Sequence, residues 1–380
     1  MGSSQADLQK WVPRLISAWR SRRKGKSRPG PADALLPDEL KEVARGVKEL
    51  SHGLTRERAL VGEKYMDQPH LLGAYLLFYW PVSYAQARSA FGELNRPRSV
   101  LDLGSGPGPL AFAALDAGAA EVTAADRSKS ALELAKALAM EASEGLATRE
   151  WTPEKPLPDG EWDTITMGHV VNELFGGQGD AIARRAKLLE TISARLKPGG
   201  TLLVLEPALR DTSRALLQVR DVLVAAGYAV RAPCLFRGPC PALVRESDWC
   251  HAERRWSPPK MVEDIARMAG LHKEALKMSY LALAPKGEAW AEPPEGRVFR
   301  IVSEPLEGKG RQRYMGCGPE GRVGLAMQER HRAPVNERFF KLERGDVVRI
   351  GAVEPKGDGL AIGAESSVEV IAYSGSPVKK

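Results

Sequence analysis

The chain has 380 residues, enough for two or three domains, and its 43% hydrophobic and 27% charged residues are typical of a globular protein. The mean hydropathy is −0.29, and the longest apolar run, residues 71–80, is too short to span a bilayer, which excludes an integral membrane protein. Four cysteines in this length exclude a secreted disulfide scaffold, and we expect no signal peptide. The expected location is the cytoplasm of a bacterium, with the mitochondrial matrix as the alternative.

The net charge of +7 is concentrated near the N-terminus, where residues 1–30 contain eight basic side chains and one acidic side chain. A basic segment favours a polyanionic partner such as RNA, because neutralising phosphates releases counterions. Two other interpretations stay open, namely a solvated tail that only aids solubility and an Arg-rich transit peptide.

The first part of the chain is predicted to be helical. Residues 8–20 place apolar side chains at helical spacing and predict a short amphipathic helix that leads into the basic run. Residues 27–37 are rich in proline and glycine, as is typical of a linker. Two further helical segments are expected at about 38–60 and 69–94, and the aromatic residues of the second are expected in the core.

From residue 98 the pattern alternates between strands and helices. Such alternation predicts an α/β fold with a mostly parallel sheet and helices on both faces. The predicted strands are residues 99–104, 121–126, 163–169, 201–206, 228–232 and 276–284. The predicted helices are residues 109–118, 128–143, 180–196 and 211–226.

Two regions depart from this alternation. An irregular insert bearing prolines and cysteines lies at 233–260, and past Pro285 short strand-like runs predict a small β module. These runs are residues 297–302, 322–327, 346–352 and 368–373. The predicted domains are a basic arm and linker, a helical region, an α/β domain with the insert, and a β-rich basic module, at residues 1–37, 38–97, 98–285 and 286–380.

A glycine-rich loop follows the first predicted strand. Gly104, Gly106 and Gly108 open the next helix, Asp102 precedes them, and Asp126 ends the second strand. Glycines let the backbone turn tightly and approach a ligand at a helix N-terminus, and an acid at the end of the second strand can accept hydrogen bonds from a ribose. The pattern predicts a nucleotide-type site, with a domain kept only as a scaffold as the alternative.

The spacing of this loop resembles motif I of class I S-adenosylmethionine-dependent methyltransferases, and residues 196–202 resemble the turn into their fifth strand. The resemblance implies a Rossmann-like class I methyltransferase fold with S-adenosylmethionine (SAM) as cofactor. It also implies that Asp102 and the three glycines flank the methionine portion of SAM and that Asp126 binds its ribose.

Whether the domain transfers a methyl group is an open question at this stage. The fourth strand ends in residues 166–174, which lack the Asn/Asp-Pro-Pro-aromatic loop of amino-group methyltransferases, and no cysteine nucleophile lies nearby. His169, Asn172 and Glu173 are candidates for the pocket, with His169 as a candidate base. The interpretation we favour is that these polar residues orient the loop.

The four cysteines are unevenly spaced. Cys234, Cys240 and Cys250 lie within 17 residues of the irregular insert, and Cys317 lies in the β module. A [4Fe–4S] cluster accepts such spacing, whereas structural zinc prefers a C-x2-C spacing that is absent here, although His251 could serve as a zinc ligand. Four unrelated buried thiols are the third interpretation.

This combination resembles the Rsm22 family of methyltransferase-like proteins, over roughly residues 38–350. The family is associated with the small ribosomal subunit. The resemblance therefore implies an assembly factor that binds small-subunit rRNA in the precursor of that subunit, with Cys234, Cys240, Cys250 and Cys317 as ligands of a [4Fe–4S] cluster. The segments that carry the resemblance are residues 100–108, 169–174, 234–241, 247–251 and 277–281.

The model that follows joins the methyltransferase-like domain to the β module through the cluster, because one of the four ligands lies in each module's own segment only at Cys317. We expect a monomer that contacts the RNA backbone, so that binding weakens steeply with salt. The predicted RNA-binding residues are Arg20, Arg22, Arg23, Lys24, Arg311, Arg313, Arg322, Arg330 and Arg332.

Overall fold

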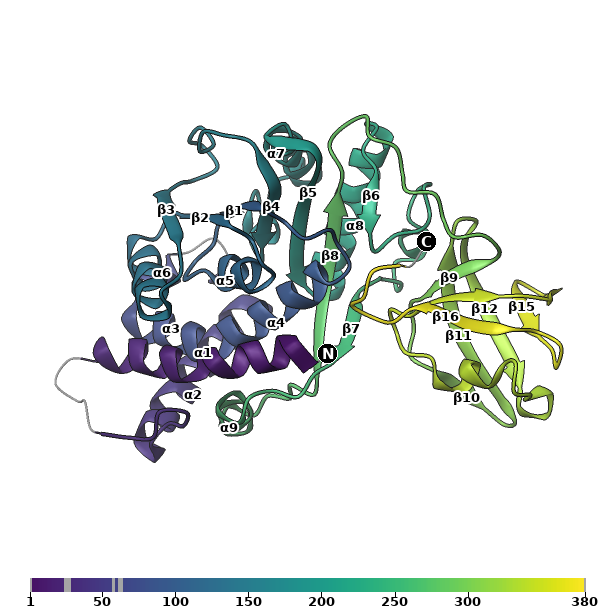
Figure 1. The fold of residues 1–380 in the computed structure, drawn as a ribbon, viewed down its shortest axis with the longest axis horizontal. Coiled ribbons are helices and arrows are strands. Elements are labelled where there is room, and N and C mark those ends of the chain that lie inside the picture. Colours follow the sequence, from purple (N-terminus) through teal and green to yellow (C-terminus); the bar gives the residue numbers. More distant parts are fainter. Residues whose placement is uncertain (1, 24–28, 57–58, 61–63, 379–380) are drawn as a thin grey trace.

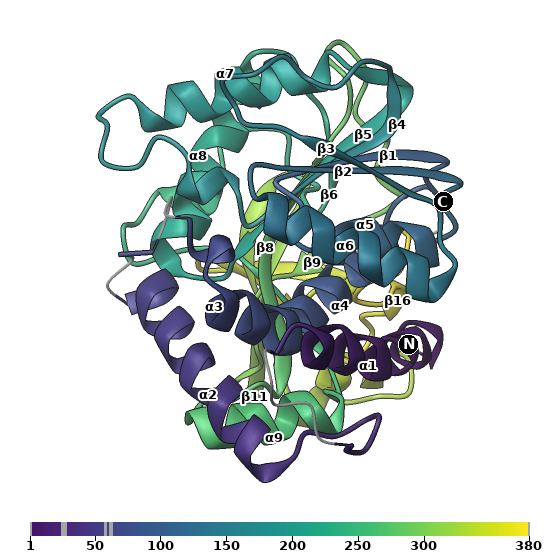
Figure 2. The ribbon, with the colours of Figure 1, turned by 90° about the vertical axis from the view of Figure 1, so that its left-hand side faces the viewer.

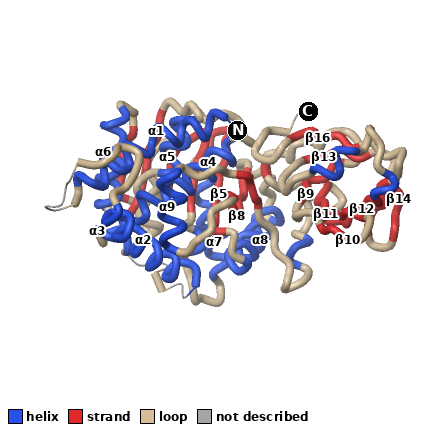
Figure 3. Tube along the Cα trace, turned by 90° about the horizontal axis from the view of Figure 1, so that it is seen from below, coloured by secondary structure: helices blue, strands red, loops and turns tan. Residues whose placement is uncertain are grey.

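The chain forms an α/β domain and a β-rich module that lie side by side (Figure 1). The computed structural model describes residues 2–23, 29–56, 59–60 and 64–378. Helices surround the α/β domain, whereas strands dominate the module (Figure 3). None of the helices in the described ranges combines the length and the apolar character needed to cross a lipid bilayer.

Eight strands form the sheet of the α/β domain, in the order β3-β2-β1-β4-β5-β8-β6, with β7 paired to the first residues of β8. Strands β1 to β5 are parallel, whereas β8 runs antiparallel to β5 and β6. This is the strand order of class I methyltransferases, and it confirms the predicted Rossmann-like fold. The strands are β1 (Ser99–Leu103), β2 (Glu121–Asp126), β3 (Leu146–Glu150), β4 (Trp162–Gly168), β5 (Leu196–Pro207), β6 (Val230–Ala232), β7 (Ala252–Arg255) and β8 (Ala275–Leu283).

Helices cover both faces of this sheet, with α7 and α8 on one face and α1, α4, α5 and α6 on the other (Figure 2). Alternate residues of β5 serve the two layers, because Leu202 and Val204 pack with α7 and α8 while Leu203 and Leu205 pack with the other helices. The α-helices are α1 (Gly2–Ser21), α2 (Pro37–Ser51), α3 (Pro69–Ala74), α4 (Trp80–Phe91), α5 (Pro109–Asp116), α6 (Lys129–Ala142), α7 (Ala181–Ser193), α8 (Arg210–Ala225) and α9 (Lys260–Ala269). Shorter helical turns are η1 (His52–Arg56), η2 (Tyr65–Asp67), η3 (Tyr75–Tyr79), η4 (Val171–Glu173), η5 (Pro241–Leu243), η6 (Glu329–His331) and η7 (Glu337–Lys341).

The sequence analysis missed two strands of this sheet. Strand β3 forms the outer edge and is mostly exposed, so that it lacks the buried apolar residues by which β1 and β4 were recognised. Strand β7 lies inside the segment interpreted as an irregular insert. Both strands are recognisable only from their pairing with β2 and β8.

The N-terminal segment is part of the domain rather than a separate arm. Helix α1 confirms the amphipathic helix predicted at 8–20, and its apolar face is buried in the same core as α4, α5 and α6. The indole N–H of Trp11 donates a hydrogen bond to Asp116 of α5 (2.7 Å). The predicted boundary at residue 37 is therefore not a boundary between independently packed domains. The buried side chains of the helix are Leu8, Trp11, Val12, Leu15, Ile16 and Trp19.

The β module is a second sheet of eight strands with a core of its own, which confirms that the C-terminal region is β-rich. Its strand order is β14-β15-β12-β11-β9-β13-β16, with β10 paired to β11. Tyr314, Leu325 and Phe339 are among its fully buried residues. The strands are β9 (Val298–Ile301), β10 (Leu306–Gly308), β11 (Arg311–Gly318), β12 (Gly321–Gln328), β13 (Val347–Ile350), β14 (Val353–Lys356), β15 (Gly359–Ile362) and β16 (Val368–Ala372).

A buried ion cluster connects the module to the α/β domain. Glu93, which follows α4, pairs with Arg254 of β7 (2.6 Å) and with Arg300 of β9 (3.0 Å). All three side chains are less than a tenth exposed. Removing one partner of such a pair would leave an uncompensated buried charge, so the cluster favours one placement of the module.

Candidate functional site

The loop after β1 has the conformation that its three glycines allow. Gly104, Gly106 and Gly108 have φ values of +70°, +52° and +82°, in the left-handed region that favours glycine. A Cβ added at Gly104 would lie 2.3 Å from the side chain of Val170. A Cβ at Gly106 would meet only Met66, at 3.5 Å, so glycine leaves the space above the loop open for a ligand.

A cavity of about 550 Å³ lies beside this loop. Gly104, Gly106 and Asp126 form one part of its wall, and residues of η2, η3 and α4 form another. The loops after β4 and β5 and the start of β8 complete it. The predicted nucleotide-type site is therefore a real cavity at the carboxyl ends of the parallel strands, where ligands bind in open α/β sheets.

Asp126 lies where an acid for a ribose is expected. It lines the cavity, and its two carboxylate oxygens accept hydrogen bonds from the backbone N–H groups of Gly106 (2.7 Å) and Ser128 (2.8 Å). Burial raises the pKa of this carboxyl. Each oxygen of an ionised carboxylate can accept a further hydrogen bond, so Asp126 can still bind a hydroxyl group of a ligand.

Asp102 lies behind the glycine loop and, like Gly108, is not part of the cavity wall, contrary to the expectation that both flank the ligand. It is fully buried and accepts hydrogen bonds from Thr166 Oγ1 of β4 (2.7 Å) and from the Ala111 N–H of α5 (3.1 Å). Burial raises the pKa of its carboxyl to about 7. Asp102 thus joins β1, β4 and the N-terminus of α5, and supports the loop from below.

The three candidates after β4 all line the cavity, but they differ in their contacts. Asn172 is tied into the protein, because its Nδ2 and backbone N–H both donate to Glu206 of β5 (2.6 and 3.1 Å). Glu206 is fully buried, and burial raises its pKa to about 8. Arg185 of α7 donates to the Asn172 carbonyl (3.1 Å), so this residue orients the loop, as the favoured interpretation predicts.

His169 has a φ of +61° and lies next to residues that the sequence analysis missed. Its Nε2 lies 3.1 Å from Oε1 of Gln86 in α4, and burial together with the nearby Lys273 lowers the pKa of the ring to about 4. The imidazole is therefore neutral at pH 7. Gln86 and Lys273 are distant from the loop in sequence, so no local pattern could have indicated them.

All four cysteines line one small pocket of about 80 Å³. Cys234, Cys240 and Cys250 come from the segment between β6 and β7 of the α/β domain, and Cys317 comes from β11 of the module. The backbone N–H of Cys240 is held by both carboxylate oxygens of Asp221 (3.1 and 2.9 Å). The structure thus brings the four candidates together at the junction of the two parts of the chain.

The surroundings of the thiols are apolar and cationic. Burial raises the pKa of Cys240 to about 12 and that of Cys250 to about 11, so the free thiols are protonated at pH 7. Arginine side chains also line the pocket, and they favour negative charge on the sulfurs. These residues, which no sequence pattern indicated, are Arg220, Arg300, Arg322 and Arg344.

The cysteine pocket also contains unpaired donors. The Nε–H groups of Arg220, Arg300 and Arg322 are buried and make no hydrogen bond within the described residues. His251 lines the pocket with its ring stacked on Trp249 (4.2 Å between ring centroids). Over the described ranges, no three His, Cys, Asp or Glu side chains form a group that could hold a single metal ion.

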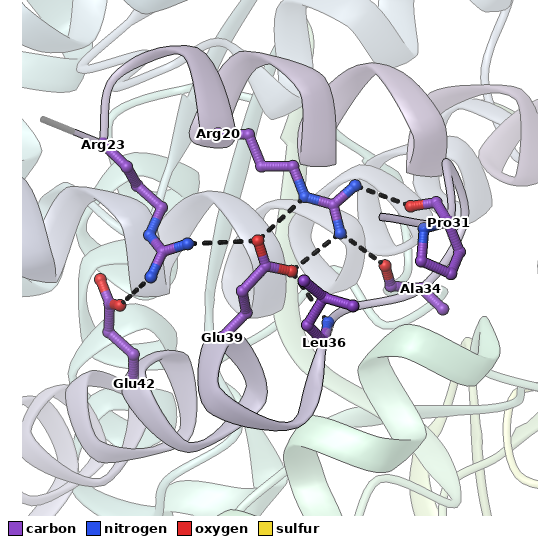
Figure 4. A network of polar contacts seen from close by, with 7 residues as sticks. All are labelled: Arg20, Arg23, Pro31, Ala34, Leu36, Glu39 and Glu42. Atoms are coloured by element: carbon purple, nitrogen blue, oxygen red, sulfur yellow. Dashed lines mark hydrogen bonds and ion pairs between the residues drawn. The ribbon is translucent and has the colours of Figure 1, made fainter. Parts of the chain in front are cut away.

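The basic residues of the predicted arm are partly neutralised within the protein (Figure 4). Arg20 donates to both carboxylate oxygens of Glu39 (3.0 and 2.8 Å), and Arg23 contacts Glu39 (3.2 Å) and Glu42 (2.6 Å). Glu39 is only 1% exposed. Arg20 and Arg23 therefore hold α1 against α2, and their charges are compensated by carboxylates. Lys24 lies outside the described residues.

The remaining predicted RNA-binding residues differ in their freedom. Arg322 pairs with Asp248 (3.0 Å) and Arg332 with Glu337 (2.8 Å). Arg311 and Arg313, by contrast, are exposed on the same face of β11 and form no ion pair with any described residue. The other two exposed candidates are Arg22 and Arg330.

Solved structures with related folds include a SAM-dependent methyltransferase from Mesorhizobium loti, with 16% identity over 53% of this chain and 97% of that chain and a TM-score of 0.34. A precorrin-6y C5,15-methyltransferase from Geobacter metallireducens has 15% identity over 53% and 87% of the two chains (TM-score 0.33). A ribosomal protein L11 methylase from Lactobacillus delbrueckii subsp. bulgaricus has 15% identity over 54% and 78% (TM-score 0.32).

No curated protein matches the sequence significantly. The model of one protein family, described as mitochondrial small ribosomal subunit Rsm22, matches residues 73–346, which is more than half of the chain. The match includes the glycine loop, the loop after β4 and all four cysteines. The chain therefore belongs to the Rsm22 family.

Proposed function

We propose that this protein is an assembly factor of the small ribosomal subunit that binds small-subunit rRNA, with SAM in the cavity and a [4Fe–4S] cluster in the cysteine pocket. The observation that carries the proposal is the convergence of four cysteines from two parts of the chain on one buried pocket. The description of its family, which names the mitochondrial small ribosomal subunit, supports the partner. We further propose that it acts as a monomer in the bacterial cytoplasm.

The cysteine pocket has the chemistry that an iron–sulfur cluster requires. Four thiolates satisfy one [4Fe–4S] cluster, which then carries a net negative charge together with its ligands. The four lining arginines offset that charge, and the unpaired Nε–H groups are donors that sulfur atoms can accept. Because Cys317 comes from the β module, a cluster would also fasten the module to the α/β domain, so that cluster binding adds to folding stability.

The cavity has the groups that SAM requires. Asp126 is placed for the ribose, the backbone of Gly104 and Gly106 for the methionine portion, and Met66 and Trp151 supply apolar surface beside Asp126 for the adenine. When bound, SAM supplies an activated methyl group. The residues of this chain bind and orient it and, through η2, η3 and α4, cover it from solvent.

The exposed arginines of β11 are the groups we assign to RNA. Arg311 and Arg313 present uncompensated charge on one face of a strand, beside the exposed Lys309. Such side chains contact phosphates and carry no base specificity of their own. Arg20 and Arg23 are not assigned to RNA, because Glu39 already occupies their guanidinium groups.

The proposal is tested by the iron, sulfide and zinc content and the visible absorption spectrum of protein purified without oxygen. About four iron and four sulfide per chain are expected for one cluster. One zinc per chain without iron would contradict the cluster and favour a zinc-stabilised RNA-binding module. Binding of small-subunit rRNA is measured on the same protein, with a transfer RNA as the competitor that separates specific from general binding.

A second candidate function, SAM-dependent methylation of RNA, is favoured by the extension of the cavity past the glycine loop to His169 and Lys273. Transfer of a radiolabelled methyl group to small-subunit rRNA tests it. An active enzyme should lose transfer in the Asp126→Ala variant, which removes the acid for the ribose. Absence of transfer, with SAM bound and rRNA bound, would leave the assembly role as the function.

A further inference from the structure

The two ends of the SAM cavity differ in charge. Asp126 follows β2, and Asp67 of η2 lies beside it, because Asp67 accepts a hydrogen bond from Ser128 Oγ (2.7 Å). Lys273 and Lys277 enter the cavity wall from the start of β8. In the sheet order, β8 and β2 are separated by β1, β4 and β5, and Pro207 at the carboxyl end of β5 pairs with Met278 of β8. The lysines therefore occupy the end of the cavity opposite the acids.

Of these two lysines, only Lys277 has a carboxylate partner. Its Nζ pairs with Glu253 of β7 (3.1 Å). Lys273 forms no ion pair and no hydrogen bond with any described residue, and the nearest aromatic contact of its Nζ is the ring of Phe78, 5.9 Å from the centroid. Burial alone lowers the pKa of Lys273, and no carboxylate lies close enough to act against it.

The neighbouring imidazole adds no positive charge. Gln86 donates from Nε2 to the Lys277 carbonyl (3.0 Å), which can only accept, so its Oε1 must face Nε2 of His169 (3.1 Å). The ring therefore carries its proton on Nε2 and is neutral. An anion that enters this end of the cavity meets one desolvated, uncompensated ammonium group, that of Lys273.

We propose that Lys273 is an anion-binding residue that receives a carboxylate or phosphate group at the β8 end of the cavity. The inference rests on the proposed function of the cavity as a SAM site. A partly desolvated ammonium group without a partner is costly, and an anionic oxygen would compensate it with a charge-assisted hydrogen bond. Two ligands carry such a group here: SAM through its α-carboxylate, and a nucleotide methyl acceptor through its phosphate.

The experiment compares the Lys273→Met variant with the wild type, and Lys277→Met serves as the matched control, because that lysine lines the same cavity but already has Glu253 as its partner. Methionine keeps most of the alkyl chain beside Phe78 and removes only the charge. The melting temperature and circular dichroism of each variant are measured first. Lys273→Arg, which keeps the charge, should retain at least part of the affinity.

Calorimetric titration with SAM and with 5′-methylthioadenosine, which lacks the α-amino acid portion, tests the first source of the anion. If Lys273 binds the α-carboxylate, Lys273→Met weakens SAM binding at least tenfold and leaves 5′-methylthioadenosine unchanged. If it binds a phosphate instead, both affinities stay unchanged, and cytidine 5′-monophosphate added to the SAM-saturated protein binds at least tenfold more weakly to the variant, while cytidine is unaffected.

Equal affinities of the wild type and Lys273→Met for all four probes would overturn the assignment of Lys273 while leaving the SAM site intact. A wild-type protein that binds neither SAM nor 5′-methylthioadenosine would instead contradict the proposed cofactor. In that case the nucleotide titration alone decides on Lys273. A loss of similar size in Lys277→Met would likewise contradict the assignment, because it would show a general effect of cavity charge.

Discussion

The SAM cavity and the cysteine pocket lie along the same strand, β8, which supplies Lys277 to the cavity and Ser279, Tyr280 and Leu281 to the pocket. They differ in how the chain builds them. The cavity wall is centred on a loop of consecutive residues at the edge of one sheet, and its glycines hold a shape that other residues resist. The cysteine pocket takes ligands from both parts of the chain, so it exists only when the module is in place.

This difference separates the two sites energetically as well. Loss of a ligand in the cysteine pocket should affect how the module is held, whereas damage to the glycine loop should affect ligand affinity. Four predictions follow from that contrast, each designed to alter one site while the other is monitored.

The Cys317→Ser variant is expected to have the largest effect. A group that binds only the folded protein, at 1,000 times its dissociation constant, adds about 4 kcal/mol to the free energy of unfolding. We expect a loss of about that size, together with loss of iron and weaker rRNA binding, measured by thermal melting, metal analysis and filter binding. SAM affinity should stay within about twofold. Ser247→Ala, at an exposed position nearby, is the control. Loss of iron without any change in melting would show that the cluster does not hold the module.

Gly104→Ala is the complementary change in the cavity. The φ of +70° costs a residue with a Cβ about 1–2 kcal/mol, and the clash with Val170 adds to this cost. We expect SAM affinity to fall at least tenfold in calorimetry, with iron content unchanged. Gly176→Ala is the control, because a Cβ there would have no neighbour within 4 Å. Unchanged SAM affinity would place the cofactor elsewhere.

The buried Glu206 predicts a pH dependence that belongs to the cavity side. Its folded-state pKa is raised to about 8, above the usual value near 4.5, so the folded protein holds a proton that the unfolded chain releases. Its contribution to stability is present below about pH 4.5 and is lost as pH rises to about 8, by at most about 1.4 kcal/mol per pH unit. Chemical denaturation between pH 5 and 8 should show a flatter profile for Glu206→Gln than for the wild type or for the exposed control Glu144→Gln. Parallel profiles would contradict this assignment.

The smallest effect is expected on the surface of the module. Replacing Arg311 or Arg313 by Ala should reduce the slope of log affinity against log salt by about 1 for each residue and weaken rRNA binding modestly. Iron content and SAM affinity should not change. Replacing Arg332, which Glu337 already neutralises, is the control and should alter the slope less. Equal slopes for all three variants would move the RNA-binding surface away from β11.

Features written in consecutive residues were predicted well. The strand, glycine loop and helix at 99–118 could be predicted because the left-handed backbone of Gly104, Gly106 and Gly108 and the apolar strand before them are local properties. The mostly parallel order of the sheet followed from the alternation of elements. The N-terminal helix was also predicted, but its place in the core was not, because its basic residues suggested a free arm.

What the sequence by itself determined is the class of fold, the position of the cofactor loop and the family, since each depends on residue type and spacing along the chain. Only the tertiary structure decided that Arg20 and Arg23 are compensated by Glu39, that four arginines surround the cysteines, and that Lys273 lacks a partner. The physical reason is that charge compensation and burial depend on distances between residues far apart in sequence. No local pattern records those distances.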